Sequence, residues 1–286
     1  MIIFSLKEDK RDITDIPDPG FFLEGDKNLC FLIHGITGTP REMGAIAHKL
    51  HNKGFTVAAP MLASHNKSLS TLKRTTWQEF YARLKDELNK LEGRFDNIFI
   101  GGLSFGALLG LKLAHELPEK IKALVCFSPT LFFDGWGTPK SKVLLPLAYH
   151  TPLKYYLYLK EGFPYGIKNP RLRSKVEAYY KNSSLFDYGK VELYGYPAIP
   201  VSCVYENHKL AKHISRLLPK ITCPIRLLQA KEDDIASPAN SYFIYERIGS
   251  KDKRVIILEN SYHIIIADDD REKVAQESIS FFEKYK

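Results

Sequence analysis

Cysteine is scarce in this chain of 286 residues. There are four cysteines, far apart in the sequence: Cys30, Cys126, Cys203 and Cys223. The first two fall inside the apolar runs 29–33 and 123–127, where free thiols pack as small apolar groups. This usage does not favour a disulfide framework and is typical of a reducing compartment. We therefore expect a cytoplasmic protein.

Long hydrophobic runs are also missing. No run of about 18 apolar residues occurs, so the sequence predicts no transmembrane helix. Residues 1–10 become charged too soon for a secretory leader. Internal repeats and low-complexity tracts are absent as well. What is left is a composition typical of globular proteins, 44% hydrophobic and 26% charged.

Acidic residues are scarce in one segment only. Residues 135–220 contain 14 Lys or Arg against 5 Asp or Glu, whereas the remainder contains 27 against 28. The net charge of +8 therefore belongs to a middle segment, and eleven of the 16 tyrosines lie between Tyr149 and Tyr205. No nucleic-acid recognition motif accompanies this charge, so we expect no nucleic-acid partner.

Apolar strand patterns alternate with amphipathic helix patterns on both sides of the basic segment. The predicted strands are 29–33, 55–59, 97–101, 121–127, 224–230 and 254–258. The predicted helices are 41–53, 76–91, 105–117, 238–248 and 271–286. This alternation predicts an α/β fold with a mostly parallel central sheet flanked by helices on both faces.

The alternation breaks between about residues 130 and 220. No strand pattern is evident there, and short helices fit best, for example at 142–160 and 171–180. We therefore predict one core in two parts, residues 1–130 and 221–286, separated by an insertion at 131–220. A chain of this length is long enough for such an inserted subdomain.

The turn from the strand at 97–101 into the helix at 105–117 carries the sequence Gly102-Leu103-Ser104-Phe105-Gly106. A serine between glycines at a strand-to-helix turn is typical of a nucleophile elbow. The turn is tight, which requires small residues two positions before and after the serine. The hydroxyl then lies at a helix N-terminus, where backbone N–H groups stabilise negative charge. Ser104 is therefore the candidate nucleophile.

The loop His34-Gly35-Ile36-Thr37-Gly38 follows the first core strand. Attack on an acyl carbonyl creates an oxyanion, which two backbone donors can stabilise. The N–H groups of Phe105, next to the serine, and Ile36, in this early loop, are the candidate oxyanion hole. For His34 we expect a structural role, holding this loop through hydrogen bonds.

Two later loops supply a candidate acid and a candidate base. Asp233 and Asp234 follow the strand at 224–230, and His263 follows the strand at 254–258. Such a histidine can accept the proton of the serine, and an aspartate can fix its tautomer and orientation. The two aspartates compete for that role, and His65 is the one serious rival of His263. The chain order Ser, Asp, His is that of α/β-hydrolases.

The chain resembles the carboxylesterase and monoacylglycerol lipase branch of the α/β-hydrolase superfamily over about residues 20–130 and 220–286. The resemblance rests on six stretches: 34–40, 54–60, 76–77, 101–106, 229–238 and 261–263. In that branch the acid lies five residues before a proline, which favours Asp233 because Pro238 follows it. The chain departs from the pattern at Ser64-His65-Asn66, where Gly-His-Gly is usual, and at Tyr262, where glycine is usual.

The resemblance implies a function and a role for the insertion. It implies a serine ester hydrolase in which Ser104, His263 and Asp233 form a triad, an acyl-enzyme forms, and neither a metal nor an organic cofactor is required. The insertion at 131–220 would form a helical cap, or lid, that gates access to the serine. Small esters or lipids, such as monoacylglycerols and lysophospholipids, are the expected substrates.

Three further hypotheses stay open. The same triad would serve an acyltransferase, and a non-catalytic hydrolase-fold module could bind a lipid through the cap. The basic, tyrosine-rich cap also suits peripheral contact with an anionic membrane, at the inner face if the protein is cytoplasmic. A solvated cap whose aromatic side chains pack on the core is the simpler alternative.

Overall fold

The computed structural model describes residues 3–5, 20–65, 67–91, 93–182, 195–196 and 198–286. Its main sheet has seven strands in the order β10-β9-β6-β5-β3-β4-β2. The short edge strand β2 (Phe21–Leu23) is antiparallel to β4 (Thr56–Ala59), and the other neighbours are parallel. The remaining strands are β3 (Asn28–Ile33), β5 (Asn97–Leu103), β6 (Ile121–Phe127), β9 (Ile225–Ala230) and β10 (Lys253–Leu258).

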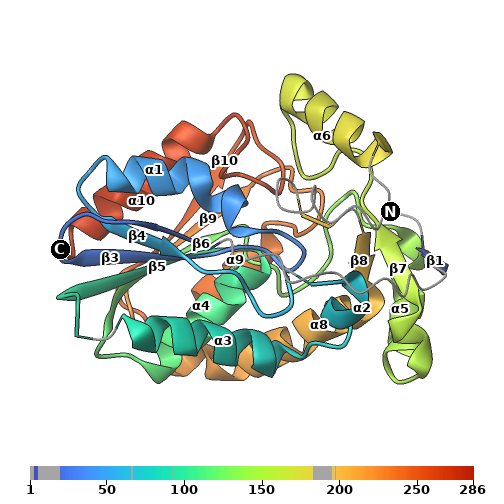
Figure 1. Cartoon of the computed structure of the whole chain (residues 1–286), viewed down its shortest axis with the longest axis horizontal. Helices are drawn as coiled ribbons and strands as arrows, with labels where there is room; N and C mark the ends of the chain where they lie inside the picture. Colours follow the sequence, from blue (N-terminus) through green and yellow to red (C-terminus); the bar gives the residue numbers. More distant parts are fainter. Residues whose placement is uncertain (1–2, 6–19, 66, 92, 183–194, 197) are drawn as a thin grey trace.

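Each face of the sheet is covered by its own set of helices (Figure 1). Successive side chains of a strand point to opposite faces, so Phe31 belongs to one core cluster and Leu32 to the other. The first cluster is closed by α3 (Trp77–Lys90), α4 (Phe105–Glu116), α8 (Val201–Leu217) and α9 (Ala239–Arg247). The second is closed by α1 (Gly44–His51) and α10 (Arg271–Glu283). The chain thus has the predicted α/β-hydrolase architecture.

The core elements follow the sequence pattern closely. All six predicted strands are present, with ends within two residues of those predicted. The helix predicted at 41–53 begins instead as the 3-10 turn η1 (Pro40–Met43), and α1 continues from it. Two short elements have no counterpart in the predictions: β2 and α2 (Leu69–Leu72).

The helix predicted at 142–160 is wrong. The chain there forms η2 (Lys140–Leu144), α5 (Leu145–Tyr149), η3 (Pro152–Tyr155) and the strand β7 (Leu157–Lys160). Proline is tolerated in the first turn of a helix but not in its interior, and here Pro146 lies in the first turn of α5 and Pro152 begins η3. β7 then pairs antiparallel with β8 (Ala198–Pro200) and with β1 (Ile3–Ser5), forming a second sheet.

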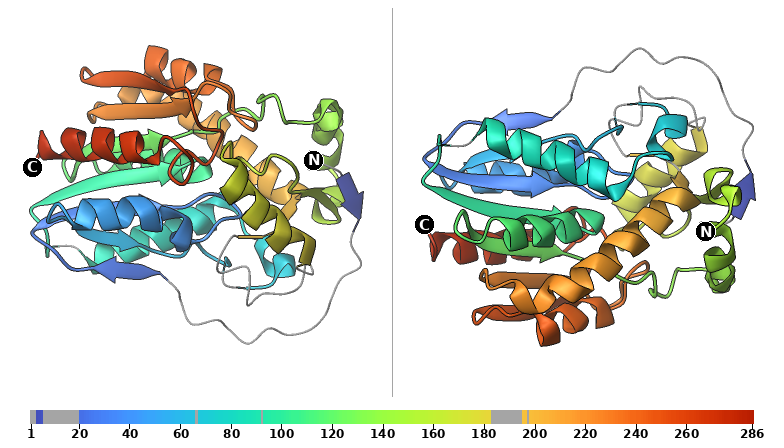
Figure 2. Two further views of the ribbon diagram at one scale, coloured as in Figure 1. Left: turned by 90° about the horizontal axis from the view of Figure 1, so that it is seen from above. Right: turned by 90° about the horizontal axis from the view of Figure 1, so that it is seen from below.

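The prediction of short helices throughout 131–220 is also incomplete. The helix predicted at 171–180 is present as α6 (Pro170–Asn182), but the segment ends in the 17-residue helix α8 and the turn η4 (Leu218–Lys220). Buried Val204, Ala211 and Ile214 recur along α8 at helical spacing. This face of α8 packs on α4 and α3, so the helix lies on the core (Figures 1 and 2).

The rest of the middle segment lies at one end of the molecule. β7, β8, α5 and α6 are grouped at the end opposite the C-terminus, and β1 joins them there (Figure 2). The division of the chain into two core parts and one insertion, with boundaries at residues 130 and 220, stays a prediction. Within the described ranges, no helix has both the length and the apolar character needed to cross a bilayer.

Candidate active site

Ser104 stands in a strained turn between β5 and α4, with φ 56° and ψ −113°. A left-handed φ is unfavourable for a residue with a side chain, and such strain is characteristic of functional sites. The flanking glycines have no room for a side chain. A Cβ on Gly102 would lie 2.4 Å from the carbonyl oxygen of Gly106, and a Cβ on Gly106 would lie 2.3 Å from that of Ile33. The elbow can therefore form only with these small residues.

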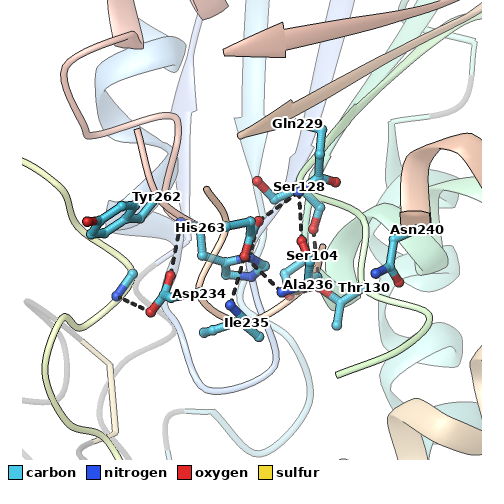
Figure 3. A network of polar contacts seen from close by, with 12 residues as sticks. Ser104, Ser128, Thr130, Gln229, Asp234, Ile235, Ala236, Asn240, Tyr262 and His263 are labelled. Atoms are coloured by element: carbon cyan, nitrogen blue, oxygen red, sulfur yellow. Dashed lines mark hydrogen bonds and ion pairs between the residues drawn. The ribbon is translucent and has the colours of Figure 1, made fainter. Parts of the chain in front are cut away.

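The hydroxyl of Ser104 is hydrogen-bonded to Thr130, just beyond β6. The two side-chain oxygens are 2.9 Å apart, and Thr130 Oγ1 donates to the carbonyl oxygen of Ser128 at 3.2 Å. Because a threonine hydroxyl has a single hydrogen, Ser104 is the donor to Thr130. Among the described residues, no hydrogen bond joins Ser104 Oγ to His263 (Figure 3).

The structure brings His263 and Asp233 together from two neighbouring strand ends. His263 follows β10 and is 3% exposed, and its Nδ1 lies 2.9 Å and 3.0 Å from the two carboxylate oxygens of Asp233. With Nδ1 occupied, Nε2 is the ring nitrogen left for other chemistry. Burial lowers the pKa of His263, but the charge and hydrogen bond of Asp233 outweigh it, and the net pKa is raised.

Asp233 is itself fixed by three donors. Its Oδ1 accepts from the N–H groups of Ile235 at 2.9 Å and Ala236 at 2.8 Å, and its Oδ2 accepts from Gln229 Nε2 at 2.8 Å. Ser241 Oγ donates to Gln229 Oε1 and holds the amide in place. These bonds stabilise the carboxylate and fix its direction toward the imidazole.

Asp234, the competing acid, contacts backbone instead of the imidazole ring. Its Oδ1 accepts from the N–H of His263 at 3.3 Å, and its Oδ2 accepts from the N–H of Gly166 at 3.2 Å. Gly166 lies between β7 and α6, so Asp234 joins the middle segment to the loop of His263. Burial, followed by the charge of Asp233, raises the pKa of Asp234 to about 6.

The loop Gly35–Thr39, which carries Ile36, is held by histidines and by the middle segment. His34 Nδ1 donates to the carbonyl of Gly35 at 2.8 Å, and His34 Nε2 accepts from Leu62 N–H at 3.1 Å, the structural role expected of His34. From the middle segment, Tyr196 N–H donates to the carbonyl of Thr37 at 2.9 Å.

His65, the rival base, lies against the same loop. Its Nε2 is 2.6 Å from the carbonyl of Ile36, and its Nδ1 is 3.0 Å from the carbonyl of Ala63. Burial lowers its pKa to about 4, so the ring is neutral near pH 7. A neutral imidazole has one N–H, and both nitrogens face carbonyl oxygens, which leaves neither available to Ser104.

A cavity of about 310 Å³ opens on Ser104 and His263. Ile36 lines it from the loop after β3, and Glu42 and Glu161 bring carboxyl groups to its wall. Burial raises the pKa of each of these carboxyls to about 7. Most of the wall is apolar and includes Phe133, Ile167, Leu172, Val176, Ile199 and Ile264. Across the described ranges, no cluster of three or more His, Cys, Asp or Glu side chains is arranged to hold a metal.

Several site residues have no counterpart in the sequence analysis. Thr130 carries a usable signal, because it follows the strand at 121–127 and strand ends of a parallel sheet meet at one edge. Glu42 carries a partial signal, because Thr39-Pro40-Arg41-Glu42 is a capping-box pattern directly after the predicted oxyanion loop. Glu161 and Tyr196 carry none, because only the tertiary structure brings their segments to the cavity.

A family model described as serine aminopeptidase, S33, matches residues 25–270. The chain belongs to this family. It is therefore a serine hydrolase of the α/β type, and the match spans the main sheet except its edge strand β2, together with the serine turn and both later loops.

Individual relatives of this S33 hydrolase are lipases and esterases. The chain is 27% identical to a thermostable monoacylglycerol lipase of Bacillus sp. (strain H-257), over 93% of this chain and 94% of the relative. It is 25% identical to a carboxylesterase of Bacillus subtilis (strain 168), over 94% and 97%.

Solved structures share the fold over nearly the whole chain. One comes from a study of two metagenome-derived lipolytic enzymes, LipS and LipT, with a TM-score of 0.76, 26% identity, and coverage of 93% of this chain and 97% of that one. Another is the monoacylglycerol lipase of Paleococcus ferrophilus, with a TM-score of 0.75, 18% identity, and coverage of 95% and 100%.

Proposed function

We propose that this protein hydrolyses monoacylglycerols and related lipid esters through Ser104, His263 and Asp233. That the chain is a serine hydrolase acting on carboxylic esters follows from its family and from its lipase and esterase relatives. The triad, the acyl-enzyme and the lipid substrate are the proposed part. One observation carries them: an imidazole fixed by a buried aspartate lines the same cavity as the elbow serine.

In the first half-reaction the Ser104 hydroxyl turns from Thr130 toward His263. Its oxygen bonds to the ester carbonyl carbon while its proton passes to His263 Nε2. The carbonyl oxygen becomes an oxyanion, which the N–H groups of Ile36 and Phe105 bind. Asp233 stabilises the imidazolium that forms.

Collapse of this intermediate breaks the bond to the alcohol, and His263 returns its proton to the departing alcohol oxygen. The acyl group then remains on Ser104. In the second half-reaction a water gives a proton to His263 and its oxygen bonds to the acyl carbon. The bond to Ser104 then breaks, the serine regains a proton, and the carboxylic acid leaves.

The cavity of about 310 Å³ lies at the lower end of the roughly 300–1,000 Å³ typical of ligand pockets, which favours a medium acyl group over a long one. Its largely apolar wall suits an alkyl chain. We expect the rate with p-nitrophenyl esters to be highest near eight to ten carbons.

Labelling with a fluorophosphonate probe tests the nucleophile. We expect the wild-type protein to be labelled and to hydrolyse p-nitrophenyl octanoate and monooctanoylglycerol. Ser104→Ala should lose both properties, with turnover reduced by about 10⁶-fold. Turnover of the variant near the wild-type rate would exclude Ser104, and an unlabelled, inactive wild-type protein would exclude the proposed function.

The same assay separates hydrolysis from acyl transfer. With glycerol or methanol present, a hydrolase releases mainly free acid, whereas an acyltransferase releases mainly the new ester. Gas chromatography of the products measures this ratio. The esterase relatives weigh against the non-catalytic alternative.

We also propose that the end of the middle segment rests on an anionic lipid surface. Its exposed apolar side chains include Val143, 73% exposed, and Leu147, 72% exposed, on η2 and α5. A basic residue lies at the end of α5: Lys154 Nζ donates to the carbonyl of Tyr149 at 3.0 Å. Lys154 and Arg74 also lie 5.2 Å and 6.0 Å from the ring centroid of Tyr155 on η3. Exposed apolar side chains on elements that also carry cations suit a membrane interface.

Sedimentation with vesicles tests this contact. We expect binding to phosphatidylglycerol-containing vesicles and little binding to pure phosphatidylcholine. Leu147→Asp should reduce vesicle binding about tenfold without changing hydrolysis of a water-soluble ester. Tyr242→Asp is the matched control, because Tyr242 is 47% exposed on α9. Equal binding by both variants would contradict the proposed surface.

The state of the cysteines bears on the cellular location of the protein. All four cysteines are free and buried, which fits the expected reducing compartment. A cytoplasmic location, with contact at the inner membrane face, stays a prediction. Fractionation of cells that produce the protein would test it.

A further inference from the structure

A single carboxyl group accepts two hydrogen bonds from the loop that carries Ile36. Glu42, on η1 just after the loop, accepts a hydrogen bond from the N–H of Thr39 at 3.1 Å and from the N–H of Gly35 at 3.3 Å. These two amides lie on either side of Ile36 in the chain. The same side chain lines the cavity that opens on Ser104.

The space for this carboxyl exists because residue 38 has no side chain. A Cβ on Gly38 would lie 1.3 Å from Glu42 Oε1, far inside any permitted contact. A Cβ on Gly35 would lie 3.5 Å from Glu42 Oε2, in ordinary contact. The loop is therefore folded directly onto the carboxyl group.

An ordinary helix cap does not require such a site. Glu79 plays the same local part at the start of α3, where its Oε2 accepts from Thr76 N–H at 2.7 Å. There the carboxyl is exposed, and hydrogen bonds from Thr76 lower its pKa. At Glu42, burial raises the pKa to about 7, although hydrogen bonds from Gly35 and Thr39 lower it. Glu42 also accepts from the N–H of Gly35 at 3.3 Å, a contact outside the cap that the capping role does not require.

We propose that Glu42 is a positioning residue that holds the Ile36 N–H in place for the oxyanion. Hydrogen bonds to the loop on both sides of Ile36 fix the orientation of the peptide unit that carries the Ile36 N–H. Small displacements of an oxyanion donor are costly, because its hydrogen bond must match the transition state. The inference rests on the proposed ester hydrolysis and adds a residue that acts through the backbone of the loop.

Glu42→Gln tests this role in the full-length protein, with Glu79→Gln as the matched control. Glutamine keeps the shape but has one acceptor oxygen, so one of the two loop amides would face an NH₂ donor. With p-nitrophenyl octanoate we expect kcat to fall about tenfold and KM to stay within about twofold. Glu79→Gln should leave both constants unchanged.

An alkyl trifluoromethyl ketone supplies a second measurement. Its hemiketal with Ser104 presents an oxygen that stands in for the oxyanion. For Glu42→Gln we expect its inhibition constant to rise by about the same factor as kcat falls. A role limited to folding or to ester binding would not link these two changes.

Several outcomes would overturn the proposal. A kcat within twofold of wild type, an unchanged inhibition constant, or a loss carried wholly by KM would each contradict it. Gly38→Ala, which displaces the carboxyl without deleting it, should reproduce the linked losses. If Glu42→Gln fails to fold, normal kinetics of Gly38→Ala would reject the role. An inactive, unlabelled wild-type protein would instead reject ester hydrolysis itself.

Discussion

The two sides of the site are held by different forces. On the acid–base side, formed by the loops after β9 and β10, the contact that matters joins a carboxylate to an imidazole at 2.9 Å. On the proposed oxyanion side, formed by Gly35–Thr39, side chains of His34, His65 and Glu42 bind backbone amides and carbonyls. Changes on the first side should therefore shift the acid limb of the pH profile, whereas changes on the second should mainly lower kcat.

The largest expected effect is that of Asp233→Asn. The amide leaves the shape intact but no longer fixes the tautomer of His263, and we expect kcat to fall about 10⁴-fold. The raised pKa of His263 depends on the charge of Asp233, so the pKa should fall in the variant. Because the neutral imidazole is the base, the acid limb of kcat/KM should move to lower pH. A full pH profile measures both changes; an unmoved limb would contradict the assignment.

A smaller effect is expected on the oxyanion side, from His65→Asn. The shorter side chain cannot reach the carbonyl of Ile36, which lies 2.6 Å from His65 Nε2. We expect kcat to fall about tenfold, with the acid limb of the pH profile unchanged. His65→Gln, whose amide nitrogen reaches further, is the control and should keep more activity. A shifted acid limb in His65→Asn would show that the two sides are not independent.

Asp234→Asn should change stability more than rate. Its folded-state pKa, about 6, lies above the ordinary value of 3.8, so the ionised carboxylate destabilises the fold. The stability that the protonated Asp234 carboxyl contributes is fully present below pH 3.8 and is lost as the pH rises through 6. Relative to wild type, the variant should gain about 2 kcal/mol in free energy of unfolding between pH 4 and pH 7.5. Urea unfolding at the two pH values measures this difference. A gain in stability confined to acid pH would contradict the predicted sign.

The smallest effect is expected from Thr130→Val. It removes the oxygen that receives the Ser104 hydroxyl at 2.9 Å and leaves the serine free to turn toward His263. We expect fluorophosphonate labelling to change by no more than about threefold, because one neutral hydrogen bond is at stake. Thr130→Ser should match wild type. A loss of labelling comparable to that of Asp233→Asn would place Thr130 among the essential groups.

The core was predictable from the sequence because local patterns and tertiary packing agree there. The strand 121–127 is apolar except for the exposed Lys122 near its start, as expected of a strand buried on both faces, and the ends of the core strands agree with the prediction within two residues. The middle segment was not predictable, because Pro146 and Pro152 lie in the first turns of new helices and β7 pairs with strands distant in the sequence. The 17-residue α8 had a helical pattern of buried residues that could have been found.

The sequence by itself determined the elbow at Ser104, since only small residues at 102 and 106 allow that turn. It also placed candidate partners on the loops after two later strands, since parallel strands end at one edge. The resemblance favoured Asp233 through its spacing to Pro238, but only the tertiary structure shows that Asp233 faces the imidazole while Asp234 binds backbone, because adjacent side chains point in different directions. The contact of Thr130 with Ser104 likewise joins segments that meet only when the chain is folded.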